Sequence, residues 1–306
     1  YITIPVQESE PGEIDINKIY NEVKKEPKDA YYTEDPFTIH PHENGIDFAI
    51  TLEEVSKLLE EEKSEYTIPL VYKEPDFTTD EIGVEAFPNE LSYFSTRYDA
   101  SLRNRSINLE LSAGKINGTV LLPGEEFSYN KTVGERTVQA GFKEAAVFNA
   151  GRVENGLGGG ICQISSTLYD AVIMADLDVT VRRNHQFVTS YVKAGADATV
   201  VWGSQDFKFK NTRKYPIKIT ITVSGGVATA KIWGVKEEVE YDITIETKKT
   251  ATIPYTTQYV QDSSLPAGQQ KIVQSGSNGQ KVEAYKVKRL NGQVISTTLL
   301  SKDTYN

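Results

Sequence analysis

Two stretches near the start of the chain place apolar residues at the spacing of one helix face. Residues 16–23 and 52–59 each carry apolar side chains three or four positions apart. Asp15 precedes the first stretch as a candidate N-cap, and Thr51 with Glu54 forms a T-x-x-E capping box before the second. The pattern therefore predicts two short, capped helices.

Strand-like patterns follow these helices and return later in the chain. The run YTIPLV at residues 66–71 is typical of a strand, so residues 1–90 are expected to form a small α+β module. Apolar residues alternate over residues 217–223, Ser-Gly-Gly supplies a turn, and residues 227–233 return. This second pattern predicts a β-hairpin.

The last part of the chain shows strand and turn signals without helical periodicity. Its Thr-, Val- and Tyr-rich runs are punctuated by glycines, namely Gly268, Gly276, Gly279 and Gly292. A chain of 306 residues is long enough for two or three domains. We expect a multi-domain α+β protein with an acidic α+β module at 1–90, a central α+β domain at 91–236 and an all-β module at 237–306.

Composition and charge narrow the class of protein. The chain is 39% apolar and 25% charged, as in ordinary folded proteins, and no apolar run approaches the ~20 residues of a membrane helix. Its net charge of -10 is uneven, because residues 1–90 hold 23 acidic and 7 basic side chains and residues 91–306 hold 20 and 26. Neither part clusters Lys and Arg with aromatics, so no nucleic-acid partner is expected.

The most distinctive stretch contains the single cysteine, Cys162, which excludes an internal disulfide. Gly158, Gly159 and Gly160 precede it, and an apolar helix face follows, made by Ile161, Ile164, Leu168, Ala171, Val172 and Ala175. A thiol in the first turn of a helix is favoured as the thiolate, and is a candidate nucleophile. The N–H groups near Gly159, Gly160 and Gln163 are candidates for holding an oxyanion or substrate. The alternative for Cys162 is a small, buried structural residue at a helix start.

A nucleophilic thiol needs a base, and His185 is the candidate. It lies in DVTVRRNHQFVTSYV, residues 178–192. The alternating pattern of this run predicts one strand, with His185 on the face toward the covering helix. Asp197, at the start of a further strand-like run, is the candidate for orienting the imidazole, with Asp206 as its rival. A helix-borne Cys, then His, then Asp is the order found in papain-like and transglutaminase-like enzymes.

Other polar residues carry weaker signals. Arg182 and Arg183 flank the candidate base, and Arg183 is predicted to recognise a substrate carboxylate, with an ordinary sheet-edge position as the alternative. His40 and His42 with Glu43 form a possible metal-ligand group, but a proline-rigid loop is the preferred interpretation. No metal and no other cofactor is predicted.

Several motifs together resemble a known family. PGEEFSYN, VGERT, GGGICQISSTLY, RRNHQFV and DATVVWGSQDFKFKN resemble a VanW domain, the family named from a glycopeptide-resistance operon, over about 140 residues. The last seventy residues resemble the G-five domain of surface proteins that act on or adhere to cell-wall glycans. The acidic front is similar to the peptidoglycan-binding module often placed before VanW domains.

The resemblance implies a bacterial cell-envelope protein. Its location would be extracellular, at the cell surface or cell wall, with the membrane reached only through an N-terminal anchor preceding Tyr1, and its partner would be peptidoglycan or another cell-wall glycopeptide. The residues add the hypothesis of an amide hydrolase or transpeptidase that uses Cys162, His185 and Asp197. A non-catalytic cell-wall-binding or scaffolding protein linked to glycopeptide resistance or envelope maintenance is the alternative.

Overall fold

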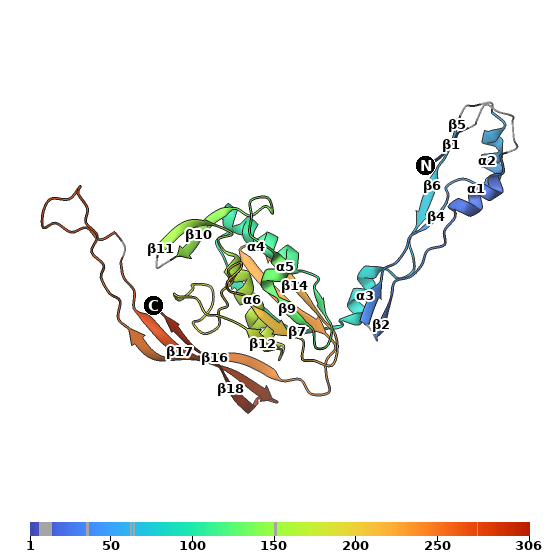
Figure 1. Ribbon diagram of the computed structural model, residues 1–306. Coiled ribbons are helices and arrows are strands. Elements are labelled where there is room, and N and C mark those ends of the chain that lie inside the picture. Colours follow the sequence, from blue (N-terminus) through green and yellow to red (C-terminus); the bar gives the residue numbers. More distant parts are fainter. Residues whose placement is uncertain (6–13, 35–36, 62, 64, 150–151, 274) are drawn as a thin grey trace. The chain divides into compact units, whose positions relative to one another are not determined.

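The structure is a computed structural model that describes residues 1–5, 14–34, 37–61, 63, 65–149, 152–273 and 275–306 (Figure 1). The chain forms two compact units, Tyr1–Ala86 and Phe87–Asn306. Each unit mixes helices and strands, so the expected combination of α and β elements is confirmed at that level.

The first unit contains short helices and three two-stranded antiparallel sheets. Its core includes Phe48, Val55 and Ile68. Its sheets pair β1 with β5, β2 with β3 and β4 with β6. Its elements are β1 (Ile2–Pro5), α1 (Ile16–Val23), β2 (Tyr31–Glu34), β3 (Phe37–His40), β4 (Gly45–Phe48), α2 (Leu52–Leu59), β5 (Glu65–Ile68), β6 (Leu70–Lys73) and α3 (Thr79–Ala86).

Both predicted helix caps are confirmed in this unit. The Asp15 carboxylate accepts the Lys18 N–H at 3.0 Å. The Glu54 N–H donates to the Thr51 hydroxyl at 3.2 Å, while the Thr51 N–H donates to the Glu54 carboxylate at 2.8 Å. The single strand expected at 66–71 is wrong, because the chain changes partner at Pro69 and β5 and β6 join different sheets.

A four-stranded antiparallel sheet forms the frame of the second unit, in the order β7-β15-β14-β8. The predicted hairpin is confirmed as β14 and β15, and Gly225 and Gly226 adopt the positive φ angles that its tight turn requires. Helix α6 packs on β7 and β15, and α4 packs on β14 and on α6. The elements are β7 (Asn89–Arg97), α4 (Arg103–Ile116), β8 (Val120–Leu121), α6 (Ile161–Met174), β14 (Ile217–Ser224) and β15 (Val227–Gly234).

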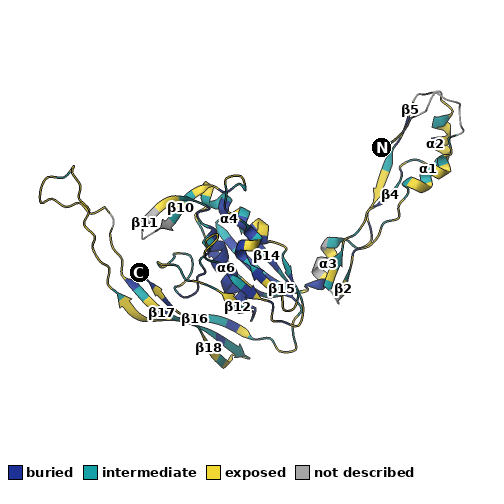
Figure 2. Ribbon diagram, viewed as in Figure 1, coloured by how far each residue is buried: buried dark blue, intermediate teal, exposed yellow. Residues whose placement is uncertain are grey.

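A smaller sheet and a hairpin complete the core around α6. The sheet has the order β12-β13-β9 and contributes the buried rings of Phe127 and Phe209. Helix α6 is buried along nearly its whole length (Figure 2). The remaining elements here are β9 (Glu126–Ser128), α5 (Tyr129–Val133), β10 (Glu144–Asn149), β11 (Arg152–Leu157), β12 (Asp178–Val181) and β13 (Lys208–Lys210).

The C-terminal region is all-β, as predicted. It is an antiparallel meander of β16 (Asp242–Ile253), β17 (Gly279–Leu290) and β18 (Gln293–Tyr305). This meander contacts the preceding core, because Ile243 joins the apolar cluster around α6 and Asp176 pairs with Lys286 at 3.0 Å. Strand β18 is tied to the segment that follows β12 by the ion pair between Arg182 and Asp303 at 2.7 Å.

The strand expected over residues 178–192 is wrong beyond Val181. Residues 182–200 form no regular strand or helix, and the run at Asp197–Trp202 makes only the isolated bridge between Val201 and Gln205. Side chains satisfy the backbone instead: the Ala198 N–H donates to the Ser166 hydroxyl at 3.0 Å. Hydrogen bonds to residues distant in the sequence have overridden the alternating pattern.

Candidate functional site

The glycine run places Cys162 in the first turn of α6. Gly160 precedes the helix in a left-handed conformation with φ of 110°, and a Cβ atom on Gly159 would lie 2.6 Å from the Ala145 carbonyl oxygen. Neither position accommodates an ordinary side chain without strain. The predicted turn into a helix is therefore confirmed, and it leaves the Cys162 side chain half-buried, 3.5 Å from the Val200 carbonyl oxygen.

His185 and Asp197 form a closely bonded pair beside this thiol. The His185 Nδ1 and its backbone N–H both lie 2.6 Å from the same Asp197 oxygen, Oδ2. The Nε2 atom lies 3.3 Å from the Tyr191 hydroxyl. The three residues predicted from the sequence are thus brought together, although His185 lies on an irregular segment rather than on a strand.

The thiol and the imidazole stabilise each other's charged forms. Burial raises the pKa of Cys162, but the hydrogen bond and charge of His185 outweigh this effect and hold the pKa below its ordinary value. Burial lowers the pKa of His185, but the hydrogen bonds to Asp197 and to Cys162 raise it to about 9. Each partner therefore favours the charged form of the other, as in a thiolate–imidazolium pair.

Asp197 is held by residues that lie far apart in the sequence. It is 1% exposed, and the Arg182 guanidinium donates to its Oδ1 at 3.1 Å and to its carbonyl oxygen at 2.6 Å. The Tyr305 hydroxyl donates to the same Oδ1 and accepts the Gly195 N–H. Burial raises the pKa of Asp197, but His185, Arg182 and Tyr305 together keep it below its ordinary value.

The C-terminal strand β18 therefore supplies part of the site. Besides Tyr305, Asp303 accepts two hydrogen bonds from Arg182, both at 2.7 Å. The sequence interpretation missed both residues, because they lie more than 100 positions from Asp197 and carry no local motif. The rival acid, Asp206, instead binds Ser128 at 2.7 Å and the Asn130 N–H at 2.9 Å, away from His185.

The candidate substrate-binding residues differ in their surroundings. Gln163 is 1% exposed; its amide donates to the Thr96 hydroxyl and the Arg97 carbonyl, and its carbonyl accepts from Arg105. These bonds make Gln163 a structural link between α6 and neighbouring segments. Arg183 is exposed, whereas Arg182 is buried in its ion pairs.

Arg136 is a further charged residue close to Cys162. It is 9% exposed, and its charge helps to lower the pKa of Cys162. Its Nη1 donates to the Gly134 carbonyl at 2.9 Å. The role of Arg136 was not predicted, although it lies in the VGERT motif that carries part of the family resemblance.

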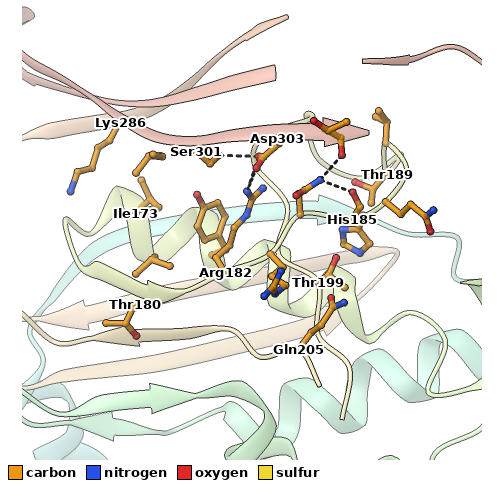
Figure 3. Close-up of a pocket in the computed structure, with 18 of the residues that line it drawn as sticks. Ile173, Thr180, Arg182, His185, Thr189, Thr199, Gln205, Lys286, Ser301 and Asp303 are labelled. Carbon is orange, nitrogen blue, oxygen red and sulfur yellow. Dashed lines mark hydrogen bonds and ion pairs between the residues drawn. The ribbon is translucent and has the colours of Figure 1, made fainter. Parts of the chain in front are cut away.

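A cavity of about 1020 Å³ opens on the His185 side of the site (Figure 3). Its lining comes from α6, from β12 and the residues that follow it up to 189, from Thr199, Val201 and Gln205, and from β17 and β18. The lining includes His185 but not Cys162. Figure 3 shows His185, Arg182 and Asp303 at the same cavity, with Arg182 bonded to Asp303. The cavity is large enough for a peptide-sized ligand and has both charged and apolar lining.

Neither a metal site nor a membrane-spanning helix is found in the part of the chain that the structure describes. No group of three or more potential ligands is placed to hold a metal ion there. His42 instead bonds the Thr79 hydroxyl at 2.8 Å, and His40 stacks on Tyr31. No helix among these residues is long and apolar enough to span a membrane.

Comparisons with known proteins agree with the motif resemblance. The family described as "VanW like protein" matches residues 104–233, and the family described as "G5 domain" matches residues 244–306. A Bacillus subtilis protein named "Uncharacterized protein YoaR" is 43% identical over 137 residues, which cover 45% of this chain and 45% of that protein. The "Vancomycin B-type resistance protein VanW" of Enterococcus faecalis is 26% identical over 140 residues, covering 44% and 50%.

These matches concern part of each protein. The chain spans about half the length of the curated relatives it matches. No solved structure matches the chain.

Proposed function

Because the chain carries a VanW domain followed by a G5 domain, we propose that it is an extracytoplasmic enzyme that cleaves or transfers amide bonds of peptidoglycan peptides. Cys162 would be its nucleophile, His185 its proton carrier and Asp197 its orienting acid. The observation that carries the proposal is the 2.6 Å contact between His185 and buried Asp197, made beside a thiol whose pKa is held low.

The proposed reaction follows from these positions. The Cys162 thiolate attacks the amide carbonyl carbon, and the bond to the leaving nitrogen breaks as the His185 imidazolium gives that nitrogen its proton. The resulting thioester is then attacked by water in hydrolysis, or by a second amine in transpeptidation, and neutral His185 accepts the proton of the attacking group. The carbon–sulfur bond breaks, which releases the acyl product and regenerates the Cys162 thiolate. Asp197 holds the Nδ1–H throughout and stabilises the imidazolium.

The order of the three residues, the cavity and the flanking regions support this proposal. Helix-borne Cys162, followed in the chain by His185 and Asp197, supports a papain-like or transglutaminase-like arrangement for the central domain. The cavity between residues 182–189 and the C-terminal strands offers room for a stem peptide next to the imidazole. The acidic first unit and the G5 domain would then localise the enzyme on the wall.

The second candidate function is a non-catalytic wall-binding or scaffolding protein. It is favoured by the half-buried state of Cys162 and by the thiol's contact with the Val200 carbonyl at 3.5 Å, which also suit a packed structural cysteine. In that case the ion pairs of Arg182 would serve to join the VanW and G5 domains. One of the curated relatives is named for vancomycin resistance, and a scaffold role in resistance or envelope maintenance is compatible with that name.

Digestion of defined muropeptides separates the two candidates. Wild-type protein and Cys162→Ala are incubated with cross-linked and uncross-linked muropeptides, and the products are identified by mass spectrometry. The enzyme proposal expects new products with the wild type alone. Unchanged muropeptides that nevertheless bind both proteins equally would favour the scaffold.

A further inference from the structure

A buried cation that makes no ion pair with the residues the structure describes lies near enough to the candidate nucleophile to act on its charge. Arg136 is 9% exposed, and its Nη1 is bonded to the Gly134 carbonyl. Its Nε and Nη2 are shielded from solvent and have no hydrogen-bond partner among the described residues. A buried charge left in this state is costly, so its presence calls for a ligand or a functional reason.

Packing places the Arg136 side chain at the start of α6. A Cβ atom on Gly158 would lie 3.2 Å from the Arg136 Cγ, and the guanidinium carbon lies 5.6 Å from the centre of the Tyr129 ring. The Tyr129 hydroxyl in turn donates to the Ile161 carbonyl, one residue before Cys162. Arg136 also acts electrostatically on the thiol and lowers its pKa.

The guanidinium lies beside an exposed aromatic side chain. Its carbon lies 5.9 Å from the centre of the Trp202 ring, and Trp202 is 46% exposed. Trp202 belongs to the short loop closed by the Val201–Gln205 bridge.

The chemistry of the free edge indicates what it binds. Nε–H and one Nη2–H of a guanidinium point in parallel and match the two oxygens of a carboxylate. Asp206 is the protein carboxylate whose charge acts on Arg136, but its oxygens bond Ser128 and the Asn130 N–H. The fork therefore has no carboxylate bonded to it among the described residues.

We propose that Arg136 binds a substrate carboxylate adjacent to the amide that Cys162 attacks, so that the site selects peptides with a free carboxylate there over their carboxamide counterparts. This inference rests on the proposed function and adds its substrate class. Arg136 would touch the substrate, while Trp202 would cover the bound carboxylate.

Two alkylating reagents test this inference without knowledge of the natural substrate. Iodoacetate carries a carboxylate and iodoacetamide its neutral counterpart, and both alkylate the Cys162 thiolate. The ratio of their rate constants on one protein cancels the thiolate fraction, so a change in thiol pKa alone does not alter it. The ratio is measured for wild type, Arg136→Gln, Arg136→Lys and the control Lys131→Gln, which removes an exposed cation of α5.

The proposal expects Arg136→Gln to lower the iodoacetate-to-iodoacetamide ratio about tenfold, given the strength of a partly buried charge pair. The ratio for Arg136→Lys should fall between the ratios for Arg136→Gln and the wild type, and the ratio for Lys131→Gln should match that of the wild type. Arg136→Met, which keeps the side-chain stem packed against Tyr129, replaces the Gln variant if circular dichroism shows that variant to be unfolded.

The other outcomes are distinct. An unchanged ratio in the folded Arg136 variants, with fast alkylation that still depends on His185, overturns the carboxylate site and leaves the proposed nucleophile standing. Alkylation of wild-type Cys162 no faster than that of a cysteine peptide contradicts the proposed function itself, and the carboxylate site with it.

Discussion

Replacement of Asp197 by Asn should weaken the nucleophile by a predictable amount. The carboxylate is the first of the groups that raise the pKa of His185, which lies at about 9 against an ordinary value of 6.5. That gap corresponds to about 3 kcal/mol of stabilisation of the imidazolium, shared between Asp197 and Cys162. The amide of Asn keeps the size of the side chain but removes its charge.

The sign of the effect on the thiol follows directly. Without Asp197 the pKa of His185 falls, the imidazolium is lost at lower pH, and the Cys162 thiolate loses its main stabilising partner. The pKa of Cys162 therefore rises. If Asp197 supplies about half of the stabilisation, the pKa of His185 falls by about one unit in the variant. The alkylation curve then moves to higher pH, and the rate below its midpoint falls by up to about tenfold.

The assay is the pH dependence of iodoacetamide alkylation, followed by intact mass. Wild-type protein should reach its rate plateau at a pH well below that of a cysteine peptide, whose midpoint is about 8.5. Asp206→Asn is the matched control, because Asp206 is a half-buried carboxylate that bonds Ser128 and Asn130 instead of His185. Coincident curves for wild type and Asp197→Asn would refute the reasoning.

Three further predictions concern the parts that build the site. Tyr305→Phe removes the hydroxyl that joins Asp197 to Gly195, so we expect a loss of about 1–2 kcal/mol in unfolding free energy and slower Cys162 alkylation. The control Tyr285→Phe, whose hydroxyl bonds Glu283, should leave the alkylation rate unchanged. Equal alkylation rates in the two variants would argue against a role for β18. Gly159→Ala should lower the melting temperature of the second unit, because the new Cβ would meet the Ala145 oxygen at 2.6 Å. The control Gly114→Ala, whose Cβ would meet no atom within 4 Å, should be neutral or stabilising by up to about 1 kcal/mol. Similar melting temperatures for the two variants would contradict the close approach at Gly159. Thr51→Ala should lower the unfolding free energy of the first unit by about 1 kcal/mol through loss of the capping box, measured by urea denaturation. The control is Ser56→Ala, which removes a hydroxyl that bonds the Leu52 carbonyl within the same helix. An equally large loss in this control would exclude a specific cap effect.

Local signals in the sequence were sufficient for several elements. Asp15 and the pair Thr51 and Glu54 mark helix starts that the structure confirms, since a cap is a contact between residues three positions apart. The glycine run before Cys162 and the β14–β15 hairpin are local in the same sense. Such features depend little on the rest of the fold.

The segment after β12 shows why the remainder was not predictable. Its alternating apolar residues indicate a strand, but the Asp197 carboxylate binds the His185 backbone, and the Thr199 N–H bonds the Arg183 carbonyl at 2.8 Å. Tyr305 reaches Asp197 across 108 positions. Long-range contacts of this kind leave no local period, so Cys162, His185 and Asp197 were identifiable by residue type while the residues that hold them were not.

Trapping an acyl-enzyme tests the central claim most directly. Wild-type protein is mixed with a muropeptide, quenched in acid within seconds, digested and examined by mass spectrometry, with Cys162→Ala and His185→Gln in parallel. The account predicts a mass increase on the Cys162 peptide equal to the acyl part of the muropeptide in the wild type, its absence in Cys162→Ala and its strong reduction in His185→Gln. Muropeptide turnover that is the same in wild type and Cys162→Ala would contradict the account.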